Sequence, residues 1–218
     1  MLHTLKLPDF VTLLNALCGV VAILLLLNGF TYLSPLLILI AAVADGLDGH
    51  IARKFSSSEI GSNLDSLADV ISFGVAPVII TYAFVDNKYI ALPALLFYFI
   101  CGILRLARFN TMDTGHNSFN GLPITAGGIA TSSYLLMGER FFSDYIVIAL
   151  TLILGILMIS NITYFKIRKQ KILIMLTIIF AATIISYYVN IEHTHIIATL
   201  LSGLMAIYVV SPIIKRTT

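Results

Sequence analysis

The sequence has no tryptophan, only two cysteines and few charges, since Asp, Glu, Lys and Arg together make up 11% of its 218 residues. So little charge beside 59% hydrophobic residues excludes an ordinary soluble domain, in which about 25% of residues are charged. Cys18 and Cys101 both fall inside apolar runs, so we interpret them as small buried residues and not as a disulfide. The net charge is only +2, and no nucleic-acid partner is expected.

Apolar runs of about 20 residues recur along the chain, which is typical of a polytopic helical membrane protein. We therefore expect an all-α integral membrane protein with about eight transmembrane helices. The expected spans are residues 9–29, 32–53, 62–85, 89–110, 122–138, 144–162, 171–189 and 194–213. The fifth is the weakest, because Pro123 and Gly127-Gly128 interrupt its start. No linker or low-complexity tract divides the chain, so residues 1–218 are expected to form a single transmembrane domain.

The basic residues predict the orientation. An even number of spans places both termini on one side of the membrane, together with the connections after spans 2, 4 and 6. Most of the 13 Lys and Arg residues fall on that side, namely Lys6, Arg53, Lys54, Arg105, Arg108, Lys166, Arg168, Lys169, Lys171, Lys215 and Arg216. Only Lys88 and Arg140 fall on the other side. The positive-inside rule therefore predicts a cell-membrane protein with both termini in the cytoplasm.

Against this apolar background, four aspartates lie at the end of the second span and the start of the third. Asp45 and Asp48 are three residues apart, and Asp65 and Asp69 are four apart, so each pair shares one helix face. The short connection makes the two helices antiparallel neighbours and brings the pairs together. Because an aspartate at a helix centre in the bilayer costs about 2.5–3.5 kcal/mol, we expect all four to face a hydrated cavity near the cytoplasmic surface.

Divalent cations would neutralise this cluster better than Arg53 and Lys54 alone. An all-carboxylate set favours hard ions such as Mg²⁺, Mn²⁺ or Ca²⁺, and two of them would balance the four carboxylates in formal charge. Small residues among the acids, such as Gly46, Gly49 and Gly61, allow a ligand to approach the backbone closely. With Arg53, which suits forked contact with phosphate, they indicate a metal-bridged diphosphate. The structural alternatives are salt bridges between helices, and glycines that serve helix packing.

The acidic stretch resembles the signature of the CDP-alcohol phosphotransferases at eight positions, Asp45-x-x-Asp48-Gly49-x-x-Ala52-Arg53 followed by Gly61-x-x-x-Asp65-x-x-x-Asp69. The connection between the two halves is shorter than is usual in that family, but each half is intact. The resemblance implies a six-helix core in which the four aspartates hold two divalent metals over the CDP diphosphate. It also implies that Asp69 is the general base and that Gly49, Ala52, Arg53 and Gly61 contact the CDP moiety.

Other polar residues bear on the acceptor alcohol. Asn15 is an amide inside the first span, and the resemblance implies that it contacts CDP. Ser72 lies on the same face as Asp69, one turn beyond it, and is expected to contact the acceptor alcohol; the alternative is a bond to its own helix. Arg105 and Arg108, three residues apart with Asn110 close behind, are expected to form an anion site for a carboxylate or a lipid phosphate. An ordinary snorkelling pair is the alternative for these arginines.

With Gly121-Leu122-Pro123, these segments resemble the phosphatidylserine synthase branch of the family over residues 8–125. The resemblance implies that CDP-diacylglycerol, or its ether-lipid counterpart CDP-archaeol, reacts with L-serine to give a phosphatidylserine-type lipid and CMP. It also implies a homodimer among membrane lipids. Serine fits chemically, because its carboxylate can pair with an arginine and its hydroxyl can attack phosphorus. The alternatives are the same chemistry with glycerol 3-phosphate or inositol phosphate, or a divalent-cation transporter.

The last third of the sequence carries weaker signals. The seventh and eighth spans contain no intramembrane charge and are expected to support the core or a dimer interface. His193 and His195 are interpreted as solvated loop residues, because their spacing suits neither a shared helix face nor the aspartate site.

Overall fold

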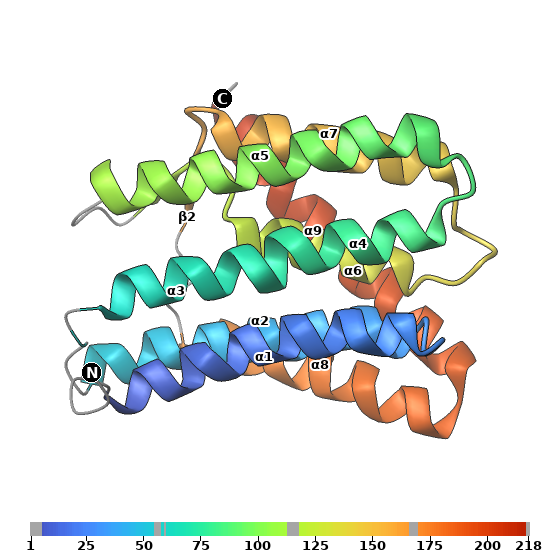
Figure 1. The fold of residues 1–218 in the computed structure, drawn as a ribbon, viewed down its shortest axis with the longest axis horizontal. Helices are drawn as coiled ribbons and strands as arrows, with labels where there is room; N and C mark the ends of the chain where they lie inside the picture. The colour runs from blue at the N-terminus through green and yellow to red at the C-terminus, as the bar shows by residue number, and fades with distance from the viewer. Residues whose placement is uncertain (1–5, 55–57, 59, 113–117, 166–169, 217–218) are drawn as a thin grey trace.

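The computed structural model describes residues 6–54, 58, 60–112, 118–165 and 170–216. Nearly all of them lie in helices that run side by side along the long axis of the molecule (Figure 1). The helices are α1 (Leu7–Leu27), α2 (Leu33–Lys54), α3 (Gly61–Asp69), the π-helical turn η2 (Val70–Val75), α4 (Ala76–Phe84), α5 (Lys88–Met112), α6 (Ile124–Leu135), α7 (Asp144–Ile159), α8 (Gln170–Val189) and α9 (Ile191–Arg216). The prediction of a helical membrane protein is confirmed.

Each expected span corresponds to one helix, with α3, η2 and α4 together forming the third. Within the described part of the chain, four helical segments are long and apolar enough to cross a membrane, namely Leu7–Leu27, Gly61–Phe84, Lys88–Thr111 and Ile191–Pro212. The apolar helices Asp144–Ile159 and Met175–Val189 are shorter. Helix α2 has an apolar first half but carries two of the aspartates in its second half. Figure 1 places the start of α1, the end of α2 and the start of α3 together; we call this the acidic end of the bundle.

Helix α6 is the most enclosed element, and all but two of its residues are buried. It begins directly after Pro123 and continues through Gly127 and Gly128, so the expected interruption at the two glycines is wrong. These glycines bring neighbouring helices close. A Cβ atom on Gly128 would lie 2.8 Å from the Phe73 side chain, and one on Gly127 would lie 2.8 Å from the Tyr98 hydroxyl. Helix α6 is therefore packed by neighbouring helices and not by lipid.

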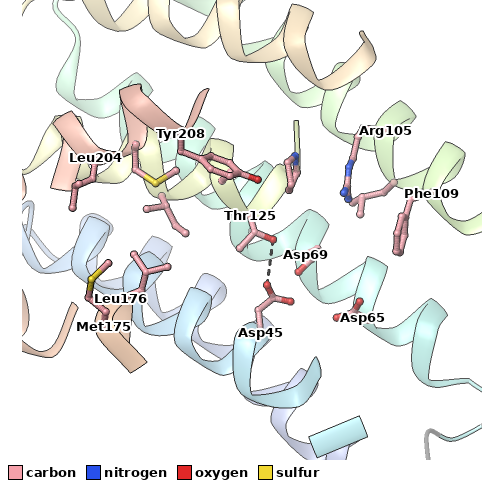
Figure 2. A pocket seen from close by; sticks show the side chains of 15 residues that line it. Asp45, Asp65, Asp69, Arg105, Phe109, Thr125, Met175, Leu176, Leu204 and Tyr208 are labelled. Atoms are coloured by element: carbon pink, nitrogen blue, oxygen red, sulfur yellow. Dashed lines mark hydrogen bonds between the residues drawn. The ribbon is translucent and has the colours of Figure 1, made fainter. Parts of the chain in front are cut away.

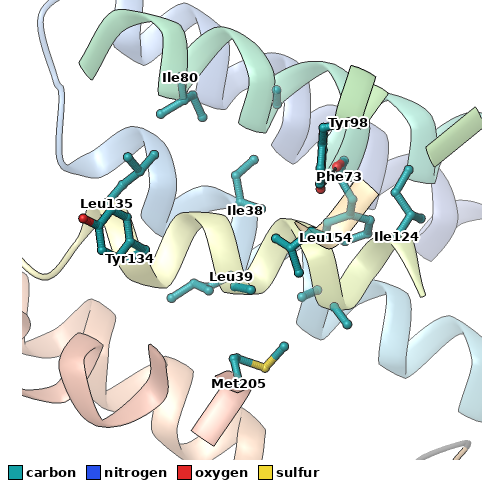
Figure 3. Packing of buried hydrophobic residues seen from close by; sticks show 14 of the residues in the cluster. Ile38, Leu39, Phe73, Ile80, Tyr98, Ile124, Tyr134, Leu135, Leu154 and Met205 are labelled. Atoms are coloured by element: carbon teal, nitrogen blue, oxygen red, sulfur yellow. Dashed lines mark hydrogen bonds between the residues drawn. The ribbon is translucent and has the colours of Figure 1, made fainter. Parts of the chain in front are cut away.

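The hydrophobic core surrounds α6 (Figure 3). Ile38 and Leu39 of α2, Leu154 of α7 and Met205 of α9 all belong to this buried cluster. Ile38, Leu39 and Leu154 are fully buried. Since helices from both halves of the chain contribute to one cluster, the described residues share a single core.

The π-helical turn follows Asp69 directly and widens the third span at its middle. The hydroxyl of Tyr98 donates a hydrogen bond to the backbone oxygen of Phe73 inside this turn (2.9 Å). On the α1 side, Gly19 allows a close approach, because a Cβ atom there would lie 2.7 Å from the Ser72 hydroxyl oxygen. π-Helical turns are rare and often found at functional sites. This one holds the helix that carries Asp69 firmly between α1 and α5.

Two three-residue strands, which the sequence did not predict, connect the loops at the acidic end. Strand β1 (Ser118–Asn120) pairs antiparallel with β2 (Thr163–Phe165), with Phe119 opposite Tyr164. Gly121 follows β1 with a φ of +83°, a conformation that L-residues with a side chain rarely adopt. Its backbone N–H donates to the oxygen of Ile162 (2.9 Å), which closes the junction between the sheet and α7.

Arg108 of α5 secures this junction. Its guanidinium donates to a group of backbone carbonyl oxygens, those of Asn120, Met158 (3.2 Å), Ile159 (3.3 Å) and Ser160 (3.0 Å). Three of these acceptors end α7, whose last carbonyls have no partner within the helix. Arg108 thus caps α7 and fixes β1 in one arrangement.

Substitution of Gly121 tests the importance of this junction. A methyl group there would collide with the Met158 carbonyl oxygen and lie 2.6 Å from the Arg108 guanidinium, in a backbone conformation already strained for alanine. Gly121→Ala is expected to destabilise the detergent-solubilised protein by about 2 kcal/mol or more, measured as a lower thermal unfolding midpoint. Gly203→Ala is the matched control, since open space surrounds Gly203 on α9. Equal thermal unfolding midpoints for Gly121→Ala and Gly203→Ala would contradict the importance of this junction for stability.

Candidate active site

The structure brings the four aspartates together at the acidic end. Asp45, Asp48 and Asp65 each place a carboxylate oxygen within 4.8 Å of the other two. Asp69 lies one turn further along α3 and lines the same cavity as Asp45 and Asp65. Asp48 and Asp69 are only 6% and 5% exposed, so their charges are largely removed from water. The antiparallel arrangement of α2 and α3 produces this convergence, as the short connection predicted.

Hydrogen bonds from neighbouring helices orient three of these carboxylates. They run from Thr12 Oγ1 to Asp48 Oδ2 (2.8 Å), from Asn15 Nδ2 to Asp69 Oδ1 (3.3 Å) and from Thr125 Oγ1 to Asp45 Oδ2 (3.2 Å; Figure 2). Thr12 and Asn15 come from α1 and Thr125 comes from α6. Thr12 also donates to the carbonyl of Pro8 (3.2 Å), so it both satisfies its own helix and reaches the acid. Thr125 was not predicted, because a threonine in a buried helix gives no local sign of its partner.

The donor set suits a divalent cation. Oxygen ligands from aspartates are the kind that hard divalent ions prefer, and at least three of them lie close enough to share one ion. Two polar atoms support this interpretation. Among the described residues, Asp65 Oδ1 and Asn15 Oδ1 are buried acceptors without a hydrogen-bond partner, an unfavourable arrangement unless a ligand satisfies them. The aspartate cluster could therefore hold a metal ion.

Two cavities flank the cluster, and Asp65 borders both. The first, of about 400 Å³, is polar where Asp45, Asp65, Asp69 and Arg105 meet and apolar along α6, α8 and α9 (Figure 2). The second, of about 280 Å³, lies between α1, α2 and α3; its lining residues are Pro8, Asp9, Thr12, Asp48, Gly49, Ser58, Gly61, Ser62 and Asp65. One carboxylate thus separates two spaces of different chemistry.

The residues expected to contact CDP are divided between the two sides of the cluster. Gly49 and Gly61 line the smaller cavity, at the point where close backbone approach was expected. Asn15 lies behind the cluster, fully buried and bonded to Asp69. Ala52 and Arg53 belong to α2, but their side chains lie outside the described residues.

Asp9 is a residue of the smaller cavity to which the sequence assigned no role. It is 1% exposed and accepts a hydrogen bond from the backbone N–H of Lys6 (2.6 Å) and one from the Ser58 hydroxyl (2.9 Å). The first bond caps the start of α1, and the second fixes part of the α2–α3 connection against that helix. An aspartate in the first turn of a helix is a recognisable capping signal, although its distant serine partner is not.

Of the residues expected to bind the acceptor, only Arg105 lines a cavity with the aspartates. It is 5% exposed, and its guanidinium carbon lies 5.1 Å from the centroid of the Phe109 ring. Ser72 is fully buried and donates to the backbone oxygen of Asn15 (2.7 Å), which makes it a contact between helices. Asn110 lies on the exposed surface and bonds to the Ser66 hydroxyl (3.0 Å).

The expected pairing of Arg105 with Arg108 in one anion site is not supported by the geometry. The Arg108 guanidinium binds the carbonyl oxygens at the end of α7 and in β1, as described above. The acceptors at the end of α7 lie about fifty residues after Arg108 in the sequence, so the local spacing of the arginines could not reveal them. Two arginines three residues apart therefore have separate functions.

The expectation that the last two spans support the core is confirmed by buried residues of α8 and α9 in the core cluster, but the interpretation of His195 requires correction. Helices α8 and α9 contribute a wall to the larger cavity, with Met175, Leu176, Leu204, Met205 and Tyr208. His193 is exposed as expected, but His195 is half-buried. The Nδ1 atom of His195 lies 2.7 Å from the Leu136 carbonyl oxygen, and the ring packs edge-on against Tyr32. His195 therefore ties α9 to the end of α6, away from the aspartates.

Comparison with known proteins identifies one family and several named relatives. The profile of the family described as CDP-alcohol phosphatidyltransferase matches residues 5–157. The chain is 43% identical to an archaetidylserine synthase of Methanothermobacter thermautotrophicus over 164 residues, which cover 73% of this chain and 70% of that protein. It is 37% identical over 205 residues to a CDP-diacylglycerol–serine O-phosphatidyltransferase of Methanocaldococcus jannaschii, covering 94% and 92% of the two chains. A protein of the same name from Helicobacter pylori is 35% identical over 162 residues, with 66% and 68% covered.

Metal binding can be tested without measuring turnover. Because cations would relieve repulsion among the aspartates, Mn²⁺ or Mg²⁺ at saturating concentration is expected to raise the thermal unfolding midpoint of the metal-free protein by roughly 5 °C or more. Asp65→Asn is expected to abolish most of this increase, whereas Glu139→Gln, an exposed change outside both cavities, should preserve it. The same increase in Asp65→Asn and wild type would place the metal elsewhere.

Proposed function

Because the chain belongs to the CDP-alcohol phosphatidyltransferase family, we propose that it transfers the phosphatidyl or archaetidyl group of a CDP-lipid to the hydroxyl of L-serine and releases CMP. The observation that carries this proposal is the buried aspartate cluster between two cavities, one small and lined by glycines, the other large and mostly apolar. The names of the relatives, a synthase of archaetidylserine and a serine O-phosphatidyltransferase, support serine as the acceptor.

The two cavities suit the two parts of the donor. The nucleotide would occupy the smaller cavity, where Gly49 and Gly61 expose backbone and where Arg53 and Ala52 are expected to complete the site. The lipid chains would follow the apolar wall of the larger cavity, or the bilayer beside it. The diphosphate would then lie at the aspartates, between the two. Divalent cations held by Asp45, Asp48, Asp65 and Asp69 would neutralise its oxygens and stabilise the charge that develops during displacement.

The reaction is one displacement at phosphorus. The hydroxyl oxygen of serine forms a bond to the phosphorus that carries the lipid, and the bond from that phosphorus to the bridging oxygen breaks, so that CMP leaves. Asp69 accepts the hydroxyl proton, and Asn15 holds that carboxylate through its bond to Oδ1. Arg105, which lines the larger cavity, pairs with the carboxylate of serine.

We also propose an orientation in the membrane, a single domain, the identity of the metal ions and a homodimer. The positive-inside rule supports an acidic end that faces the cytoplasm. A single domain is supported by the larger cavity, which residues from α2, α3, α5, α6, α8 and α9 line together. Mg²⁺ and Mn²⁺ are the proposed ions, with Ca²⁺ also compatible with the ligands. The proposal of a homodimer is supported by the resemblance to the CDP-alcohol phosphotransferases.

The other candidate functions fit the site less well. Glycerol 3-phosphate or inositol phosphate would bring a second phosphate beside the four carboxylates, and among the described residues Arg105 is the one cation that lines either cavity. A transporter for divalent cations should carry acids along its path. Among the described residues, Asp9 lies beside the cluster, and the other acids, Asp86, Glu139, Asp144 and Glu192, lie in or next to the connections between helices, away from it.

The acceptor can be identified directly. Purified protein with Mn²⁺ and either CDP-diacylglycerol or CDP-archaeol is expected to release CMP in the presence of L-serine. Glycerol 3-phosphate and inositol phosphate should give little or none. Mass spectrometry of the product distinguishes the two donors. CMP release with either phosphorylated alcohol but none with serine would contradict the proposed acceptor.

The role of Asp69 as base predicts a large and specific loss. Asp69→Asn keeps the size of the side chain but cannot accept the proton, so kcat is expected to fall at least about a hundredfold. The variant should retain the elution volume and helical circular dichroism of the wild type. Asp86→Asn, the same change at an exposed position away from the aspartates, should keep full activity. A kcat for Asp69→Asn within a few fold of wild type would exclude Asp69 as the base.

A further inference from the structure

Helix α9 lies beyond the residues that the family profile matches, yet it lines the same cavity as the aspartates. Leu204 and Met205 border the apolar part of this cavity. Tyr208, one turn further along, lies where the apolar wall meets the polar part. Figure 2 shows its hydroxyl directed into the cavity, towards the side on which Thr125 and Arg105 lie. Among the described residues of α8 and α9 that line this cavity, Tyr208 carries the one polar group, and it points to the region proposed for the acceptor.

The position of Tyr208 is fixed by a buried neighbour. The ring centroids of Tyr208 and Tyr164 are 5.7 Å apart, and the Tyr164 hydroxyl donates to the backbone oxygen of Val209 (3.0 Å). Tyr164 is fully buried on β2, and burial raises the pKa of its phenol. Strand β2 is in turn paired with β1, which Arg108 holds. The small sheet thus anchors α9 against the cavity.

The chemistry of the proposed acceptor supplies the reason for a second donor. Serine carries an ammonium group, which the aspartates attract, and a carboxylate, which they repel. The carboxylate therefore needs hydrogen-bond donors of its own, and Arg105, which lines the same cavity, is one. Building on the proposed function, we propose that Tyr208 is an acceptor-specificity residue whose hydroxyl donates a hydrogen bond to the serine carboxylate beside Arg105. A neutral phenol adds a donor without adding charge to an already polarised site.

Steady-state kinetics of the full-length protein with two acceptors test this assignment. Tyr208→Phe keeps the ring that packs on Tyr164 and removes only the hydroxyl. It is expected to raise the KM for L-serine about tenfold, with the KM for the CDP-lipid unchanged, because one hydrogen bond to a charged group is lost. The KM for serinol, in which a hydroxymethyl group replaces the carboxylate, should be the same in Tyr208→Phe as in the wild type. The preference for serine over serinol, measured as a ratio of kcat/KM values, should therefore fall about tenfold.

The control is Tyr188→Phe, the same change on α8 at a residue that is 74% exposed and lines neither cavity. It should leave both kinetic constants unchanged. An unchanged serine KM and preference in Tyr208→Phe would overturn the assignment, and so would an equal loss with both acceptors, since that result marks a purely structural residue. Wild-type protein that releases no CMP with L-serine would instead refute the proposed function itself.

Discussion

Repulsion among four buried or half-buried carboxylates is the constraint that organises this molecule. Three of their oxygens, those of Asp45, Asp48 and Asp65, lie within 4.8 Å of one another inside a helical bundle. The protein responds with one hydrogen-bond donor for each of three acids, from two different helices. Helices α1 and α6 must therefore lie against α2 and α3 at a fixed depth. The polar residues inside these otherwise apolar helices are explained by this requirement.

Small residues make that convergence geometrically feasible. Gly19 brings α1 onto the π-helical turn, and Gly128 brings α6 onto Phe73 of the same turn. The turn follows Asp69 immediately, so a shift of either neighbour would move the residue that is proposed to accept the proton. The hydroxyl of Tyr98 satisfies a carbonyl within the turn and limits its movement. Packing and polar contacts thus act on the same few residues, which is how a site is held to the accuracy that displacement at phosphorus requires.

The sequence predicted well what depends on neighbouring residues and poorly what depends on distant ones. Hydrophobic run length located all eight expected spans within a few residues, and the spacing of Asp45, Asp48, Asp65 and Asp69 predicted their convergence. Thr125 and Tyr208 were missed, because a hydroxyl in an apolar helix resembles ordinary packing until its partner is known. The two short strands escaped notice for the same reason, since their partners are more than forty residues apart.

The position of Asp65 between the two cavities has a stereochemical consequence. If the nucleotide of the CDP-lipid fills the smaller cavity and its chains follow the apolar wall of the larger one, the polar part of the larger cavity stays open to the alcohol. The serine hydroxyl can then attack the phosphorus atom from one face while CMP leaves from the opposite face. A single displacement of this kind inverts the configuration at phosphorus. On the proposed route the lipid passes directly to the alcohol without a covalent enzyme intermediate, and both substrates would occupy the protein together.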